Sequence, residues 1–124
     1  MNGKFLLDTN AVIALLNGHV PLIALLQSAT WVGITVITEL EFLSFSSLSE
    51  QDKLLFEQFK NRIEVINLDT NDTALIQAIC QIRHTYHLKL PDAIIGAAAI
   101  EYQATLLSND AIFARVTTLS LQTF

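Results

Sequence analysis

The sequence predicts an α/β fold in which helices flank a mainly parallel, five-stranded sheet, within one domain spanning residues 1–124. Two observations support this prediction. Strand-like and helix-like apolar runs alternate along the chain, as they do when helices connect parallel strands. The chain has 124 residues and no linker, repeat or low-complexity segment, so its length suits one domain.

Short apolar runs rich in β-branched residues predict the strands. They span residues 4–7, 31–37, 63–68 and 105–107, with a weaker fifth candidate at 119–121. Glycine, proline and hydroxyl residues mark the helix boundaries: Gly18 ends one helix and Pro21 begins the next, while Thr38 and Ser49 are predicted N-caps. The expected helices cover residues 11–16, 21–28 and 38–45, and three more follow Ser49, Thr70 and Pro91.

Composition narrows the class of protein further. Hydrophobic residues make up 52% of the chain and charged residues 15%, against about 25% charged residues in an average domain. A dense core and an apolar partner surface both account for this shortage of charge. Cys80 is the only cysteine, so no disulfide forms within the chain, which fits a reducing compartment. No apolar run is long enough to span a membrane, and we expect a cytoplasmic protein.

Four carboxylates occupy equivalent places in the predicted fold. Asp8, Glu41 and Asp110 follow predicted strands, and Asp92 opens a predicted helix. The carboxyl ends of parallel strands and the helix starts that follow them share one edge of a sheet, where ligands bind. Four acids at this edge would repel one another unless a cation lay between them. Because Mg²⁺ and Mn²⁺ prefer oxygen ligands, the pattern predicts a divalent-metal site.

Each acid also has a purely local interpretation. Asp8 can cap the helix that follows it, and Asp92 can interact with the dipole of its helix from the first turn. Thr38 and Glu41 have the spacing of a capping box, in which the glutamate reaches back to the threonine amide. Asp110 can act as a cap in the same way. These interpretations place the acids at helix starts, and they leave open whether the four side chains also form a site.

Charge and motifs exclude several classes of site. The chain has 12 acidic and 7 basic residues, a formal net charge of −5, so it is not a strongly basic nucleic-acid binder. It lacks a phosphate-binding loop, a dinucleotide motif and a serine nucleophile elbow. The three histidines and Cys80 do not have zinc-ligand spacing. A carboxylate-bound cation with open positions instead suits phosphodiester hydrolysis, because it can activate water and offset charge on the leaving oxygen.

Four segments together resemble the PIN-domain nucleases, and in particular the VapC-like toxins of toxin–antitoxin pairs. The segments are LLDTN at 6–10, TELEFL at 38–43, LPDAII at 90–95 and LSNDAIF at 107–113. They occur in the order of the family motifs, and the resemblance covers nearly the whole chain. It implies a PIN-like domain with a five-stranded parallel sheet and a Mg²⁺- or Mn²⁺-dependent endoribonuclease activity.

The resemblance also assigns site residues. It places the catalytic and metal-binding acids at Asp8, Glu41, Asp92 and Asp110, with Glu39 as the reserve for the second position. Thr9, Asn10 and Ser108 would then position carboxylates or touch a phosphate. Ser108 stands where the family often has threonine.

Two surface features relate to partners. Arg83, His84, His87 and Lys89 form a basic cluster near Asp92, which would steer RNA phosphates or simply complement a helix C-terminus. Aromatic residues crowd two consecutive helices, and part of this set is expected to form an apolar groove for a partner helix. The family resemblance implies an antitoxin there, near Phe42, Phe45, Phe56 and Phe59, and a homodimer.

Two other functions remain open at this stage. A receiver-like phospho-acceptor module has a similar length and α/β pattern, and Asp69 follows the third predicted strand as its acceptor would. However, Asp8 is not part of an adjacent acid pair, and no lysine ends the fifth strand. The other alternative is a PIN fold that binds a partner without catalytic turnover.

Overall fold

Five parallel strands form a sheet in the order β3-β2-β1-β4-β5 in this computed structural model, which describes residues 3–124. The strands are β1 (Lys4–Leu7), β2 (Trp31–Thr35), β3 (Glu64–Ile66), β4 (Thr105–Leu107) and β5 (Leu121–Gln122). The predicted fold class is therefore confirmed, with a sheet that is entirely parallel. The fifth strand lies two residues later than the sequence indicated.

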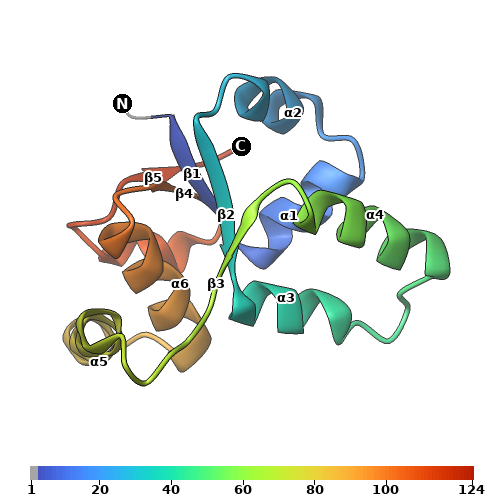
Figure 1. Cartoon of the computed structure of the whole chain (residues 1–124). Helices are drawn as coiled ribbons and strands as arrows, with labels where there is room; N and C mark the ends of the chain where they lie inside the picture. The colour runs from blue at the N-terminus through green and yellow to red at the C-terminus, as the bar shows by residue number, and fades with distance from the viewer. Residues whose placement is uncertain (1–2) are drawn as a thin grey trace.

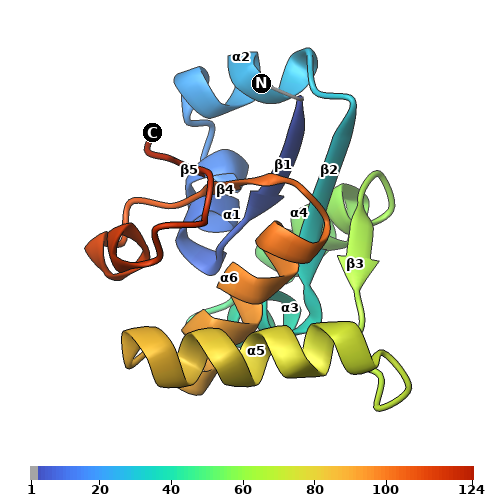
Figure 2. The ribbon, with the colours of Figure 1, turned by 90° about the vertical axis from the view of Figure 1, so that its left-hand side faces the viewer.

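Helices cover both faces of the sheet (Figure 1). They are α1 (Thr9–Leu16), α2 (Val20–Gln27), α3 (Val36–Leu43), α4 (Glu50–Lys60), α5 (Thr73–Tyr86), α6 (Leu90–Glu101) and the 3₁₀ helix η1 (Ala111–Arg115). One face carries α1, α3 and α4, and the other carries α6 with α5 outside it, as Figure 2 shows. This arrangement gives the molecule three layers, with the sheet in the middle.

Alternation along the central strands divides the apolar side chains between two cores. Leu6 of β1 contributes to the core beneath α5 and α6, whereas Phe5 and Leu7 contribute to the core beneath α1, α3 and α4. Successive side chains of a strand point to opposite faces, so one short apolar run supplies both cores. Helix α6 is buried almost all round, from Ala93 to Ala99, because it lies between the sheet and α5.

The parallel topology brings distant segments to one edge of the sheet. The chain leaves β1, β2 and β4 at this edge and enters α1, α3 and η1, with a three-residue loop before η1. The backbone amide of Asp8 donates to the carbonyl of Leu107 at 3.3 Å, which ties the end of β1 to the end of β4. The loops and helix starts at this edge are the expected location of a ligand site.

One predicted helix cap is wrong. Helix α3 begins at Val36, and its N-cap is Thr35, whose hydroxyl accepts from the amide of Thr38 at 3.3 Å. Thr38 therefore lies inside the first turn, and β2 ends before residues 36 and 37. The hydroxyl of Thr38 is fully buried and has no hydrogen-bond partner among residues 3–124. The capping box between Thr38 and Glu41 does not form. The other boundaries fall within a few residues of those predicted, and Ser49 caps α4 in a capping box with Asp52.

No individual helix within residues 3–124 has both the length and the apolar character needed to cross a membrane. Helices α1 and α2 meet these criteria only as a pair, bent by 100° at their junction, and only by length and composition.

Candidate active site

The four predicted acids line one cleft at the carboxyl edge of the sheet. The cleft has a volume of about 260 Å³. Asp8 follows β1, Glu41 projects from α3, Asp92 lies in the first turn of α6, and Asp110 precedes η1. The other lining residues are Thr9, Asn10, Phe45, Ile95 and Phe113. Segments separated by up to about a hundred residues thus contribute oxygen atoms to the same space.

Asp8 both caps a helix and faces the cleft. Its Oδ1 accepts from the amide of Ala11 at 2.8 Å, and the Ser108 hydroxyl hydrogen-bonds to its carboxylate. The residue is only 6% exposed, and this burial raises the pKa of its carboxyl above the usual value. The charges of Asp110 and Glu41 raise the pKa further, while the two hydrogen bonds oppose the shift.

Burial and neighbouring charges act on Asp92 in the same direction as on Asp8. It is half-buried in the first turn of α6. Burial is the largest cause of its raised pKa, and the negative charges of Asp110, Glu41 and Asp8 raise the pKa further. Lys89, the N-cap residue of α6, opposes the shift with its positive charge. Each of the four acids therefore contributes to the electrostatic repulsion in the cleft.

Glu41 and Glu39 project from α3 into different surroundings. Oε1 of Glu41 accepts from the Thr9 hydroxyl at 2.5 Å at the rim of the cleft. Oε2 of Glu39 forms an ion pair with Nζ of Lys60 on α4 at 2.8 Å. The structure thus brings Glu41 to the other three acids and holds Glu39 away from them.

Ser108 links two of the acids through its side chain. It is fully buried at the end of β4, where its hydroxyl contacts the Asp8 carboxylate and accepts from the amide of Asp110 at 3.0 Å. The carboxylate of Asp110 in turn accepts from the amide of Ile112 at 3.0 Å and caps η1. The serine therefore links the carboxylate of Asp8 to the backbone of Asp110.

Asn109 is a site-loop residue that sequence reasoning did not select. Its side chain bonds to both backbone groups of Phe124, accepting from the nitrogen at 2.8 Å and donating to the oxygen at 2.9 Å. The one sequence feature that could have pointed to Asn109 is its position between the two site residues Ser108 and Asp110. However, the identity of its partner depends on the pairing of β4 with β5, which local sequence does not reveal.

The donor set suits a hard divalent cation. No ion pair with a lysine, arginine or histidine neutralises the four carboxylates within residues 3–124, and their ligand atoms are oxygens, as Mg²⁺ and Mn²⁺ prefer. In the same part of the chain, no three His, Cys, Asp or Glu side chains are drawn together closely enough to hold a metal ion directly. Water molecules between the cation and the carboxylates, which Mg²⁺ commonly keeps, would allow the four acids to share one ion.

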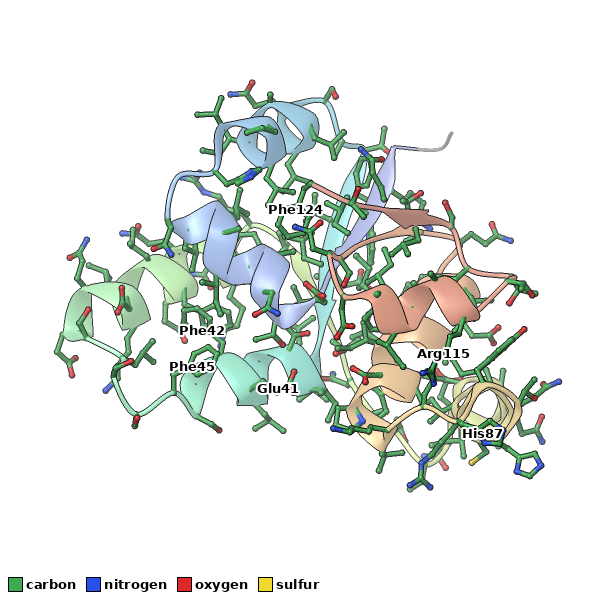
Figure 3. All side chains as sticks on the ribbon, turned by 180° about the vertical axis from the view of Figure 1, so that it is seen from behind. Glu41, Phe42, Phe45, His87, Arg115 and Phe124 are labelled. Carbon is green, nitrogen blue, oxygen red and sulfur yellow. The ribbon has the colours of Figure 1, made fainter. Side chains whose placement is uncertain are left out.

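The other predicted contact residues divide between two places. Thr9 and Asn10 line the cleft, and Ser108 lies beneath it. Arg83 does not line the cleft. It lines a separate, open pocket of about 440 Å³ at the end of α5, together with His84 and His87. Figure 3 shows His87 beside the start of α6, on the other side of the sheet edge from Glu41. The pocket contains no acidic residue; its remaining lining residues are Ile79, Cys80, Leu88 and Leu90.

An apolar pocket of about 310 Å³ lies next to the acidic cleft, between α1, α3 and α4. Phe42 and Phe45, which Figure 3 shows on α3, line it, and Phe45 also lines the cleft. The predicted groove residues are only partly correct: Phe56 is fully buried behind Phe42, with rings stacked at 4.5 Å, and Phe59 does not line the pocket. The remaining lining comes from Ile13, Leu16, Asn17, Ser47, Leu48, Asp52 and Leu55.

One known protein family matches most of the chain. The family described as PIN domain matches residues 5–119. No curated protein sequence matches the chain.

Several solved structures share the fold. A VapBC2 structure from Rickettsia felis, bound to a DNA fragment from its promoter, is similar with a TM-score of 0.80 and 23% identity, covering 97% of this chain and 98% of that chain. A toxin–antitoxin complex from Klebsiella pneumoniae has a TM-score of 0.77 and 25% identity, covering 94% and 95%. A DNA-bound VapBC from Salmonella typhimurium has a TM-score of 0.75 and 22% identity, covering 97% of each chain.

Proposed function

Since the chain belongs to the PIN domain family, we propose that it is a divalent-metal-dependent endoribonuclease and the toxin of a toxin–antitoxin pair. One observation carries the catalytic part of this proposal: four carboxylates from four separate segments line one cleft, and none of them forms an ion pair with a cationic side chain of residues 3–124. The toxin assignment is supported by the similar structures, which are VapBC and toxin–antitoxin complexes.

Each acid has a role in this proposal. Asp8, Asp92 and Asp110 hold Mg²⁺ or Mn²⁺ directly or through water, and Glu41 binds the same cation or orients the attacking water. When bound, the cation supplies charge stabilisation on the scissile phosphate and its leaving oxygen. Burial is the main cause of the raised pKa values of Asp8 and Asp92, and neighbouring negative charges add to it. A divalent ion would offset the negative charge of the cleft.

Neighbouring polar groups orient the acids. Ser108 fixes Asp8 relative to Asp110, and Thr9 keeps Glu41 at the rim. Asn10 is exposed in the cleft, where its amide can donate to a phosphate oxygen. These groups are uncharged, so they position the carboxylates without neutralising them.

RNA cleavage tests the catalytic proposal. Purified protein is incubated with a fluorescently labelled single-stranded RNA of mixed sequence and with total tRNA, in the presence of Mg²⁺, Mn²⁺ or EDTA. We expect cleavage that requires the metal and is lost in Asp8→Asn. Metal binding without cleavage of any RNA would favour the non-catalytic alternative. Phosphorylation of Asp69 by acetyl phosphate would favour the receiver alternative, although its carboxylate already accepts from the Asn71 amide at 2.9 Å.

We also propose that Arg83 contacts RNA phosphates outside the cleft. Its pocket contains basic groups and no acid, and the adjacent Lys89 acts electrostatically on Asp92. Arg83→Ala is therefore expected to raise KM about threefold to tenfold and to weaken the salt dependence of RNA binding. Arg62→Ala is the matched control, because Arg62 lies in a different pocket beside the start of β2 and β3. Equal KM values for the two variants would contradict this role.

The apolar pocket beside the cleft is the proposed antitoxin site. A helix of the antitoxin would place its apolar side chains against Phe42 and Phe45, at a position that also limits access to the acids. Phe45→Ala is expected to reduce co-purification with the protein encoded by the adjacent upstream reading frame. Leu54→Ala is the matched control, because Leu54 is 53% exposed and does not line the pocket.

We also propose that the chain forms a homodimer. Large apolar side chains are exposed on several helices, which is typical of a surface that binds another chain. They include Leu40 and Leu43 on α3, Ile76 on α5 and Leu90 at the start of α6. Sedimentation of the purified chain as a dimer, and as a monomer after Leu40→Glu, would support this assembly. A wild-type monomer at micromolar concentration would contradict it.

A further inference from the structure

The loop that carries Ser108 and Asp110 is fastened to residues at the far end of the sequence. The amide of Ser108 donates to the carbonyl of Gln122 at 3.1 Å, in line with the pairing of β4 and β5. One residue later, the Asn109 side chain accepts from the nitrogen of Phe124 at 2.8 Å and donates to its oxygen at 2.9 Å. The side-chain amide of Asn109 thus makes the two hydrogen bonds that the backbone of a paired strand residue would make. It extends the β4–β5 pairing beyond the end of β4.

The Asn109–Phe124 pair acts on both neighbours of Asn109. Ser108 on one side contacts the Asp8 carboxylate and the amide of Asp110 through one hydroxyl. Asp110 on the other side is exposed, and its carboxylate accepts a hydrogen bond from the amide of Ile112. A change in the backbone at Asn109 would therefore move Asp110 and disturb the serine that links it to Asp8.

The other half of the pair is itself anchored. Strand β5 is only two residues long and lies at the edge of the sheet, so its own ladder gives limited support. The ring of Phe124 meets the ring of His19 edge-on, with centroids 5.5 Å apart, and His19 caps α2 through Nδ1. Figure 3 shows Phe124 near α2, well away from His87 and Arg115. The segment 121–124 therefore connects the α1–α2 junction to the acidic cleft.

We propose that Asn109 is a positioning residue, whose two hydrogen bonds to the backbone of Phe124 hold Ser108 and Asp110 in the arrangement that binds the metal. The inference rests on the proposed function, because it assigns a supporting group to that same site. It makes residues 121–124 part of the active-site framework, although none of them lines the cleft.

Asn109→Ala tests this role against a matched variant, Thr105→Val. Thr105 also joins β4 to the segment before β5, through a 2.9 Å hydrogen bond to the Ser120 hydroxyl, but away from the cleft. Mn²⁺ binding is measured by the electron paramagnetic resonance signal of the free ion. We expect about tenfold weaker binding for Asn109→Ala, because groups that orient metal ligands typically contribute 10–100-fold. Thr105→Val should bind Mn²⁺ like the wild type.

A second pair of variants acts from the other end. Phe124→Pro removes the backbone donor to Asn109, whereas Phe124→Ala removes the ring and keeps both hydrogen bonds. Amide hydrogen exchange at Ser108, Asp110 and Ile112 is measured without metal. We expect the fastest exchange in Asn109→Ala and Phe124→Pro, which lose hydrogen bonds of the pair. Phe124→Ala should be intermediate, because it loses only the ring contact with His19, and Thr105→Val should exchange like the wild type. This measurement shows loop order independently of metal affinity and catalysis.

The outcomes separate the inference from the function it rests on. Wild-type exchange at the loop amides in Asn109→Ala, or wild-type Mn²⁺ affinity in that variant, would overturn the positioning role and leave the nuclease proposal intact. Failure of the wild-type protein to bind Mn²⁺ would overturn the metal-site proposal and with it the inferred role of Asn109 in metal binding.

Discussion

The two sides of α3 carry glutamates in opposite electrostatic surroundings. On the side facing α4, Glu39 forms a 2.8 Å ion pair with Lys60, which Glu57 also contacts at 3.2 Å. On the side facing the cleft, Glu41 receives one hydrogen bond from Thr9 and faces three further acids. Two residues of sequence separate a neutralised carboxylate from an uncompensated one. The difference shows that the direction of a side chain from the helix decides between a structural and a site role.

Other acids outside the cleft also have local structural roles, as helix caps. Asp52 completes the capping box of α4 with Ser49, and Asp72 caps α5 by accepting from the amide of Leu75 at 3.2 Å. These carboxylates accept from nearby backbone amides, and neither lines the acidic cleft. In the cleft, Asp8 also satisfies a local donor, but its pKa stays above the usual value because burial and neighbouring charges dominate. Capping a helix and forming part of a site are therefore compatible roles.

Asp8→Asn is expected to have the largest effect on activity. The amide keeps the shape of the side chain and the acceptor for Ala11, but it removes the charge and weakens the metal ligand. We expect metal-dependent RNA cleavage to fall at least about a hundredfold, beyond the effect typical of groups that only orient ligands. The Tm of the metal-free protein should stay equal or rise, because repulsion with Asp110 and Glu41 is relieved. Retained cleavage at the wild-type rate would contradict the assignment of Asp8.

Glu41→Gln and Glu39→Gln test the comparison directly. We expect Glu41→Gln to lower kcat about tenfold or more with little change in Tm. Glu39→Gln should leave kcat unchanged and lower the free energy of unfolding by no more than about 1 kcal/mol, as for a partly exposed ion pair. Kinetics and chemical denaturation measure the two quantities. If the kinetic effects were exchanged, Glu39 rather than Glu41 would be the second acid of the site.

The pH dependence of stability should differ between the metal-free wild type and Asp8→Asn. The folded pKa of Asp8 lies above its ordinary value of 3.8, so ionisation costs folding free energy at neutral pH. This cost is lost as pH falls through the raised pKa towards 3.8, and stability gains accordingly. The variant lacks this gain, so the stability difference between the two proteins should shrink on acidification. Bound Mn²⁺ should reverse the trend, since metal binding requires ionised ligands. A pH-independent difference would contradict the raised pKa.

Thr38→Val is expected to have the smallest effect. The buried hydroxyl of Thr38 has no hydrogen-bond partner within the described part of the chain, and valine has nearly the same shape. Replacing an unsatisfied polar group with a methyl group should raise the free energy of unfolding by up to about 1 kcal/mol. Urea denaturation measures this change. A loss of stability would show that the hydroxyl makes a hydrogen bond in solution, and Thr38→Ser would then restore it.

Most of the fold was predictable because its signals are local. Alternating apolar runs placed all five strands, and Gly18, Pro21 and Ser49 marked real helix boundaries. The failure at Thr38 is instructive, because Thr35 three residues earlier offers an equivalent hydroxyl. Where β2 stops depends on its pairing with β1 and β3, which extends only as far as Thr35. Sequence periodicity does not include that pairing.

The sequence by itself determined the α/β class, the parallel edge where distant segments meet, and the set of acids that reach it. These follow from hydrophobic periodicity and helix-start chemistry, which act over a few residues. Only the tertiary structure decided that Glu39 pairs with Lys60 away from the cleft, that Arg83 lies outside the cleft, and that Asn109 bonds to Phe124. Those outcomes depend on how each helix is rotated against the sheet and which strands pair, and packing between residues far apart in sequence sets both.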